Sequence, residues 1–210
     1  MTNLEMLAKV RTFLDESAED FYFDDEEIYP ALSDAQREIV NVIANNWFYQ
    51  GRPLYAPIPR TLQPLVLDTS GTLALGTNSI TVASQVVVPV SLRWNPNGAV
   101  VADLKNCVFV TEGEVYMLIS NKSLADGYYA WWNNTGVYVN PISANASASY
   151  NLKTIKAPVD ITASVQPVTD EVAHDAIVER SLWLLLKDRE TQQAQIHLQM
   201  YGQLLQGLMQ

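Results

Sequence analysis

The sequence has a single cysteine and no long apolar run, and each shortage excludes a class of protein. Cys107 alone cannot form a disulfide within the chain or complete a zinc site of several cysteines. It lies in the strand-like run NCVFV, where a buried small side chain is the expected role. No run approaches the roughly 20 apolar residues that cross a bilayer, and the N-terminus lacks the pattern of a secretory signal. We therefore expect a protein made and kept in the cytosol, with no membrane partner.

Positive charge is scarce and unevenly distributed. The chain has 13 Lys and Arg against 23 Asp and Glu, for a net charge of −10. Residues 1–50 hold eleven acidic and three basic residues (−8), residues 51–166 six and seven (+1), and residues 167–210 six and three (−3). Such a chain lacks the basic field that attracts nucleic-acid phosphates. We expect no ordinary or sequence-specific nucleic-acid binding, so DNA could pass beside the protein without sticking to it.

Signatures of catalysis are missing as well. The sequence has no Gly-x-Ser-x-Gly elbow, no phosphate loop and no dinucleotide-binding glycine pattern. Its nearest approach to a metal site is Glu171-x-x-His174, a pair that di-iron bundles use twice. The second pair is absent, because Ala194 stands three residues before His197. We expect no enzymatic activity, no metal and no cofactor, and we interpret His174 as a helix residue that hydrogen-bonds across a packed interface.

Helical periodicity fills most of the first 50 residues. Apolar residues recur at the spacing of one helix face over residues 4–14 and again over residues 28–47. Asp24 or Asp25 can cap the second helix, because a carboxylate accepts hydrogen bonds from the free N–H groups at a helix start. Four prolines between positions 53 and 64 then predict an irregular connector. The apolar positions of the first helix are Leu4, Leu7, Ala8 and Leu14.

From about residue 65 to residue 165 the apolar period changes to two. Short runs rich in Val, Ile, Thr, Tyr and Trp are separated by Gly, Asn, Asp and Pro, which predicts a β-sandwich or barrel of roughly eight strands. Only 11 of the 103 residues from 64 to 166 are charged, so its outer surface suits contact with other protein. The runs are LVLD, TLALG, SITVA, QVVVPVSLRW, NCVFV, EVYMLI, GYYAWW, GVYVN and YNLKTI.

After Pro167 helical periodicity returns and continues to the end of the chain. Thr169 is the predicted N-cap of the next helix, and that helix is apolar on two sides, so it should be buried on both. One side carries Ala173, Ala176, Ile177, Trp183 and Leu184, and the other carries Val178, Leu182, Leu185 and Leu186.

The last segment, residues 192–210, is amphipathic and holds seven glutamines. Neutral glutamine beside an apolar stripe is typical of an assembly surface. The predicted fold class is therefore α+β. Residues 1–63 and 167–210 form one helical domain, into which an antiparallel β-domain of residues 64–166 is inserted. The apolar stripe of the last segment consists of Leu198, Tyr201, Leu204, Leu205, Leu208 and Met209.

The aromatic run GYYAWW leaves two interpretations open. Alternation along a strand places Tyr128 and Trp132 on one face and Tyr129 and Trp131 on the other. Whichever pair faces outward could stack on sugars or insert into a partner, because exposed aromatic rings serve both purposes. Strand core plus a protein interface is the interpretation we prefer, since aromatic residues are enriched in both settings.

Three stretches of the helical ends match a pattern that is known from one family. Residues 10–40, VRTFLDESAEDFYFDDEEIYPALSDAQREIV, contain an Arg-x-x-Leu-Asp turn that leads past an aromatic and an acid into a helix. IKAP (155–158) and HDAIVERSLWLLLKDRE (174–190) follow as a strand end and the start of the C-terminal helices. In this order they resemble the portal adaptors, also called head-to-tail connector or neck proteins, of tailed bacteriophages. The long β-segment departs from the compact helical members of that family.

The resemblance implies a structural virion protein of the head–tail neck, assembled in the host bacterial cytoplasm. Twelve copies would form a ring beneath the portal protein, with DNA passing through it and a tail or second neck-ring protein below. The portal-binding residues would be the stripe from Leu198 to Met209, and the subunit interface would include Ile177, Trp183 and Leu185. The alternative function is a tail-associated β-rich module that binds carbohydrate or protein through Tyr128, Tyr129, Trp131 and Trp132.

Overall fold

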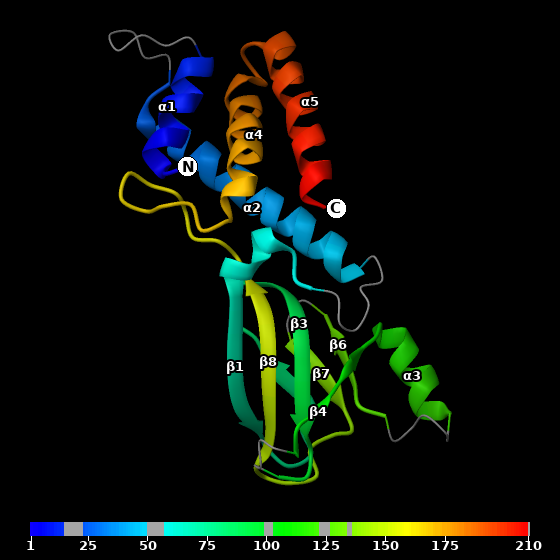
Figure 1. Cartoon of the computed structure of the whole chain (residues 1–210). Helices are drawn as coiled ribbons and strands as arrows, with labels where there is room; N and C mark the ends of the chain where they lie inside the picture. The colour runs from blue at the N-terminus through cyan, green and yellow to red at the C-terminus, as the bar shows by residue number, and fades with distance from the viewer. Residues whose placement is uncertain (15–22, 50–56, 99–102, 122–126, 134–135, 210) are drawn as a thin grey trace. The chain divides into compact units, whose positions relative to one another are not determined.

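The structure is a computed structural model, and it describes residues 1–14, 23–49, 57–98, 103–121, 127–133 and 136–209. The chain folds into two compact units, each with its own core. The helical unit contains both ends of the chain, drawn in blue and in orange to red in Figure 1, and the β-unit contains residues 66–156. The predicted α+β class with a β-region between helical ends is confirmed. Residues 157–166, which the sequence had placed with the strands, belong to the helical unit.

The helical unit is organised around its fourth α-helix. Helix α4 packs against α1, α2 and α5, and the small and branched residues Ala176, Ile177, Val178 and Leu182 are fully buried. The expectation of a helix buried on two sides is confirmed. Among the described residues, no helix is long and apolar enough to cross a membrane. The elements are α1 (Asn3–Phe13), α2 (Asp25–Tyr49), η1 (Arg60–Leu65), η3 (Glu171–Ala173), α4 (His174–Leu186) and α5 (Thr191–Leu208).

Local side-chain chemistry fixes where the helices begin. The Asp24 carboxylate accepts a hydrogen bond from the Glu27 N–H at 2.9 Å, which confirms one of the two predicted caps of α2. The cap before α4 differs from the prediction. Asp170, and not Thr169, accepts from the Val172 N–H at 3.2 Å, and this bond lowers the pKa of Asp170. The Thr169 hydroxyl is buried and has no hydrogen-bond partner.

The buried side of α1 also differs from the prediction. Met6 and Val10 are fully buried, whereas Leu4 is exposed. Both sets of residues have helical spacing, so the pattern alone could not choose between them. Packing against the rest of the helical unit selects the Met6 side.

The β-unit is a sandwich of two four-stranded sheets. One sheet has the order β1-β8-β3-β4 and is antiparallel throughout, and the other has the order β2-β7-β6-β5. The β5–β6 pair is parallel, which is the one departure from the antiparallel pairing that the sequence led us to expect. The sheets do not close into a barrel. The strands are β1 (Val66–Leu73), β2 (Ser79–Thr81), β3 (Val86–Asn95), β4 (Lys105–Asn106), β5 (Val108–Phe109), β6 (Tyr129–Trp132), β7 (Gly136–Asn140) and β8 (Ala148–Lys156).

Side chains from both sheets form the core of the β-unit. Trp94 and Leu92 of β3 and Leu152 of β8 meet Val137 and Val139 of β7. The Trp94 indole N–H donates to the Pro141 carbonyl at 2.9 Å, so the ring is buried without an unpaired donor.

Three of the nine predicted strand runs are corrected by the structure. EVYMLI is not a strand but most of helix α3 (Glu112–Ser120). Thr111 and Glu114 form a capping box there, in which the Glu114 N–H donates to the Thr111 hydroxyl at 3.3 Å and the Glu114 carboxylate accepts from the Thr111 N–H at 2.7 Å. LVLD and TLALG contribute to one strand, β1, and are not separate strands.

Candidate functional site

Helix α5 has two apolar faces, and they have different surroundings. The inner face is buried through Ala194, His197 and Tyr201, with α4 as its main neighbour. Of the six residues that the sequence assigned to the portal, Tyr201 is buried, and Leu204 and Met209 are the exposed ones. Leu198, Leu205 and Leu208 are half-buried.

The outer face of α5 carries a second apolar stripe, of which the sequence interpretation had included only Leu204. Ile196, Met200 and Leu204 are 57%, 42% and 36% exposed, and they follow one another at intervals of four residues, which keeps them on one side of a helix. Exposed glutamines flank them, and residues 191–208 contain no Asp, Glu, Lys or Arg. We call these three residues the α5 stripe. The i, i+4, i+8 spacing of these residues in the sequence could have identified the stripe.

A buried acid–histidine pair joins α5 to α4. His197 Nδ1 lies 2.7 Å from a carboxylate oxygen of Glu179, and both side chains are almost completely shielded from water. The Phe13 ring meets the imidazole edge to face at 5.9 Å between centroids. A buried carboxylate is costly unless it is paired, so His197 is part of what allows Glu179 to lie inside the unit. This contact makes α5 an integral helix of the unit and not a mobile arm.

A second polar cluster ties α5 to α2. Arg180 Nε donates to a Glu38 carboxylate oxygen at 2.8 Å, and the Tyr201 hydroxyl donates to the other oxygen at 3.3 Å. Burial, together with the nearby Glu38 charge, raises the pKa of Tyr201 to about 12. Tyr201 is therefore a neutral hydrogen-bond donor inside the unit, where a partner protein cannot reach it.

The predicted subunit-interface residues lie in three different environments. Ile177 is fully buried in the core of the helical unit, so its role is internal packing. Trp183 is half-buried, and its ring is contacted by the Arg180 guanidinium at 4.0 Å and the Lys187 ammonium at 5.4 Å from the ring centroid. Leu185 is half-buried. Trp183 and Leu185 retain some surface, and Ile177 has none.

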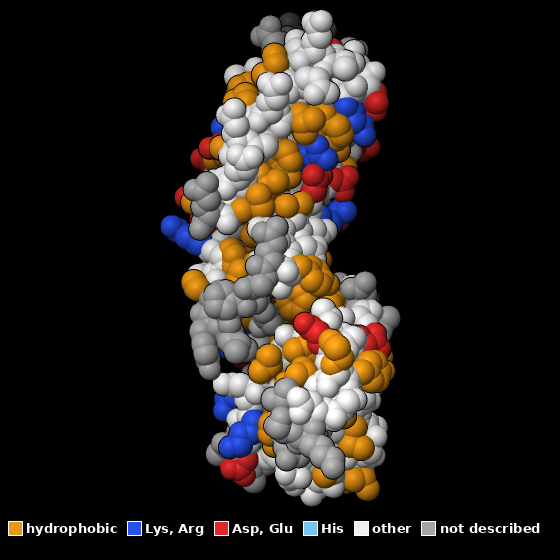
Figure 2. Space-filling view, turned by 90° about the vertical axis from the view of Figure 1, so that its right-hand side faces the viewer, with side chains coloured by type: hydrophobic (Ala, Val, Ile, Leu, Met, Phe, Trp, Pro, Cys, Tyr) orange, Lys and Arg blue, Asp and Glu red, His pale blue; other side chains and the backbone are white. Residues whose placement is uncertain are grey.

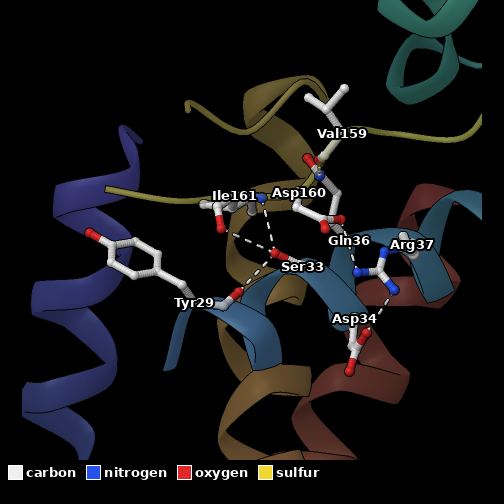
Figure 3. Close-up of polar contacts among 8 residues, drawn as sticks. All are labelled: Tyr29, Ser33, Asp34, Gln36, Arg37, Val159, Asp160 and Ile161. Carbon is white, nitrogen blue, oxygen red and sulfur yellow. Dashed lines mark hydrogen bonds and ion pairs between the residues drawn. The ribbon is translucent and has the colours of Figure 1, made fainter. Parts of the chain in front are cut away.

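Residues 157–170, which we call the connecting segment, lead from β8 to α4 and are held by side chains of α2. The Ile161 N–H donates to the Ser33 hydroxyl at 2.9 Å, and the Gln36 amide donates to the Val159 carbonyl at 3.0 Å. Ser33 and Gln36 are buried. Figure 3 shows both side chains of α2 turned toward the segment, with Arg37 reaching Asp160 beside them. The backbone of an irregular segment thus finds its partners in buried polar side chains, which is how such a segment avoids orphaned groups.

The first residues of α1 hold the same segment from another side. The Asn3 amide donates to the carbonyls of Thr162 and Ala163 at 2.7 and 3.0 Å, and the Gln166 amide donates to the Asn3 side-chain oxygen at 2.7 Å. Asn3 is almost fully buried. These bonds fasten the beginning of the chain to a segment about 160 residues later.

The residues with reactive or metal-binding side chains that the sequence singled out are His174, Glu171 and Cys107, and their contacts in the structure are those of folding and packing. His174 Nε2 lies 3.1 Å from the Thr169 carbonyl and Nδ1 lies 2.8 Å from the Met1 amino group, and burial is the main cause that lowers the pKa of His174. The Glu171 carboxylate is exposed, 3.9 Å from the same amino group. Burial raises the pKa of Cys107 to about 12, so its thiol stays protonated at neutral pH. Nowhere in the described part of the chain do three or more His, Cys, Asp or Glu residues cluster as metal ligands.

The aromatic strand β6 is covered on both faces. Tyr128, Ala130 and Trp132 pack on the core between the sheets, as the alternation predicted for one side. Tyr129 and Trp131 lie on the opposite face and are also buried.

Helix α3 accounts for the burial of that opposite face. Val115 and Leu118 of α3 pack on Tyr129 and Trp131, and the Trp131 ring stacks on Tyr138 of β7 with centroids 5.4 Å apart. Of the rings that we considered for sugar stacking, Tyr129 and Trp131 are therefore shielded by a helix that sequence analysis had assigned as a strand.

The outward side of α3 is apolar too. Tyr116, Met117 and Ile119 are 64%, 68% and 41% exposed, and we call them the α3 face. In Figure 2 hydrophobic side chains gather on each unit among many uncharged polar ones. The α5 stripe and the α3 face are the candidate binding surfaces of this chain. Comparison with protein-family models and with curated proteins finds no match to the chain.

Proposed function

We propose that this chain is a structural protein of a tailed-bacteriophage virion. Its copies form an adaptor ring, of twelve subunits by analogy with the family it resembles, that joins the portal to the tail and continues the DNA channel. The observation that carries the proposal is the exposed apolar side of α5 on a helix without Asp, Glu, Lys or Arg. A protein that works by assembly needs surfaces of this kind to bury against partners.

The acidity of the helical unit fits a protein that borders a DNA path. Helix α2 starts with the exposed residues Asp25, Glu26 and Glu27, and DNA phosphates are repelled by such a surface. A wall that repels the duplex lets it slide, whereas a basic wall would hold it. The isolated protein should leave a DNA duplex unshifted in a gel even at low salt, where cationic binding is strongest. Tight, salt-sensitive binding would contradict a role beside the DNA.

The portal contact belongs to the C-terminal end of α5 in this proposal. Leu205 and Leu208 are half-buried and Met209 is exposed, so apolar surface remains uncovered at this end of α5. An amphipathic helix end of this kind fits a groove between the subunits of a larger ring.

A truncation after Leu204 tests the portal contact. It removes Leu205 to Gln210 and leaves His197 and Tyr201 in place, so the Glu179 and Glu38 carboxylates keep their partners. We expect a folded protein that no longer co-sediments with the portal protein of the phage that encodes it. A cut after Gln195 would remove both partners and test folding instead. Undiminished co-sedimentation of the Leu204 truncation would overturn the assignment.

A tail-associated carbohydrate-binding module is the weaker alternative. Tyr129 and Trp131 are buried under α3, and Tyr128 and Trp132 pack on the sandwich core, so no ring is offered as an open platform. Titration with host-surface glycans separates the two functions. An adaptor should give no saturable signal, and saturable binding lost on Trp131→Ala would favour the module.

A further inference from the structure

The chain carries two unpartnered apolar helix faces, one in each unit. The α5 stripe, Ile196, Met200 and Leu204, lies on the helical unit beside the buried face of α5 that contains Ala194, His197 and Tyr201. It is flanked by neutral glutamine, so nothing on the helix itself opposes burial against another apolar surface.

The α3 face is the counterpart in the β-unit. Tyr116, Met117 and Ile119 are exposed and stand outside the cluster that Val115 forms with the β6 aromatics. A helix that is apolar on two sides is expected to be covered on two sides. One side of α3 is covered by its own sheet, and among the described residues nothing packs on the other.

Charge decides which surface of a second copy each face can meet. The helical unit, residues 1–51, 57–65 and 157–210, holds 18 acidic and seven basic residues, for a net charge of −11. The β-unit, residues 52–56 and 66–156, holds five acidic and six basic residues, for a net charge of +1. Two helical units that approach each other bring like charges together, whereas a helical unit and a β-unit do not repel. Charge therefore favours a contact between the helical unit of one copy and the β-unit of a second copy.

Symmetry leads to the same pairing. A contact of the α5 stripe with the α5 stripe of another copy is isologous, and it closes as a dimer. A contact between different faces of successive copies is heterologous, and it forms a ring when the rotation between copies closes. We propose that the α5 stripe of one copy packs on the α3 face of the next. This inference rests on the proposed function for its ring, while the charges and exposed residues that support it do not depend on the portal.

The contact should be weak for one pair and strong for a closed ring. Three exposed side chains on each face cover less than the roughly 800 Å² per partner of a stable interface. When the ring closes, the last contact forms within one assembly. The stability of the ring then exceeds that of a single pair, although every contact is of the same kind. Self-association of the isolated chain is thus expected at high protein concentration.

Two charge variants and their mixture test the pairing. Met200→Glu places an acid in the α5 stripe, and Met117→Glu places one in the α3 face. In sedimentation equilibrium over rising concentration, the full-length chain should associate, and each variant should lose at least tenfold in association constant. Gln195→Glu and Ile142→Glu add the same charge at exposed positions that belong to neither face, and should associate as the unaltered chain does.

The mixture distinguishes a heterologous contact from a symmetric one. Equal amounts of Met200→Glu and Met117→Glu should form pairs and nothing larger, because one variant keeps the α3 face and the other keeps the α5 stripe. A chain that stays monomeric at every concentration, a Met117→Glu variant that still associates, or a mixture without pairs would overturn the proposal. Because this assay contains no portal, a full-length chain that self-associates but does not co-sediment with the portal would count against the proposed function alone.

Discussion

The helical unit and the β-unit are each stabilised internally by a different kind of contact. In the helical unit, buried polar side chains bridge parts of the chain more than 100 residues apart, as Asn3 does with Thr162 and Gln36 with Val159. In the β-unit, apolar side chains such as Trp94 and Leu152 fill the space between two hydrogen-bonded sheets. The helical unit must join two chain ends that are separated by a whole domain. It does so with specific hydrogen-bond partners, whereas the β-unit relies on burial and backbone ladders.

The largest effect should come from breaking the buried pair between α4 and α5. His197→Ala leaves the Glu179 carboxylate inside the unit without its partner at 2.7 Å. Removing one member of a buried pair costs about 3–5 kcal/mol, so we expect the free energy of unfolding to fall by that amount in urea denaturation.

A double variant separates the pair from the volume it fills. Glu179→Leu combined with His197→Phe removes both polar groups and keeps the side chains large, and apolar replacements of whole buried pairs are often tolerated. This variant should be more stable than His197→Ala. If it were equally destabilised, packing and not the orphaned carboxylate would explain the loss.

In the β-unit, an apolar truncation should have the greatest effect. Leu152 is buried between the sheets, and Leu152→Ala leaves a cavity that costs about 2–5 kcal/mol. Hydrogen exchange should show the β-strands opening before α4, because each unit has its own core. Leu67→Ala on β1 is the matched control, since Leu67 is exposed and its change should stay within about 0.5 kcal/mol. Equal loss of protection in α4 and β8 would mean that the units unfold as one.

The sequence predicted the organisation of the chain better than its contacts. The change of apolar period from helical to two and back located both kinds of structure, because amphipathic helices and half-buried strands impose different periods on their own residues. The strand prediction for EVYMLI was wrong because a short unbroken apolar run is compatible with either period. The capping box of Thr111 and Glu114 stabilises this run as a helix. The outward residues Ile196 and Met200 were missed because Leu198 and Tyr201 form an equally regular stripe on the inner side.

Pairs between distant residues could not be predicted at all. Glu179 and His197 lie 18 positions apart on two helices, and no local pattern connects them. The same holds for Ser33 and Ile161, which are 128 positions apart. Such contacts depend on how α2, α4 and α5 pack, and helix packing is not encoded in the period of any single helix.

A smaller effect is expected where the connecting segment is held by α2. Ser33→Ala removes the acceptor of the Ile161 N–H and leaves a buried donor unpaired, which costs about 1–3 kcal/mol. Asp34→Ala, one position along the helix, removes an exposed ion pair with Arg37 and should cost at most about 1 kcal/mol. The two midpoints in urea, at equal denaturant slope, measure the difference. Equal stability of the two variants would show that the segment does not depend on this bond.

The smallest effect concerns pH and His174. Nε2–H donates to the Thr169 carbonyl at 3.1 Å, so Nδ1 of the neutral ring accepts from the Met1 amino group at 2.8 Å. Burial in the first place, and the neighbouring amino group as well, lower the pKa of His174 from the ordinary value of 6.5, against the opposing effects of the Thr169 bond and of Glu171 and Asp170. As pH falls below 6.5, the unfolded chain therefore binds a proton that the folded chain does not, and the free energy of unfolding decreases until the folded-state pKa is passed. Above pH 6.5 this contribution of His174 to stability is fully present.

His174→Gln should flatten the dependence of the free energy of unfolding on pH below 6.5. Asp170, whose pKa is lowered, loses its contribution only at more acidic pH and does not interfere. An unchanged pH profile in the variant would show that another group titrates there.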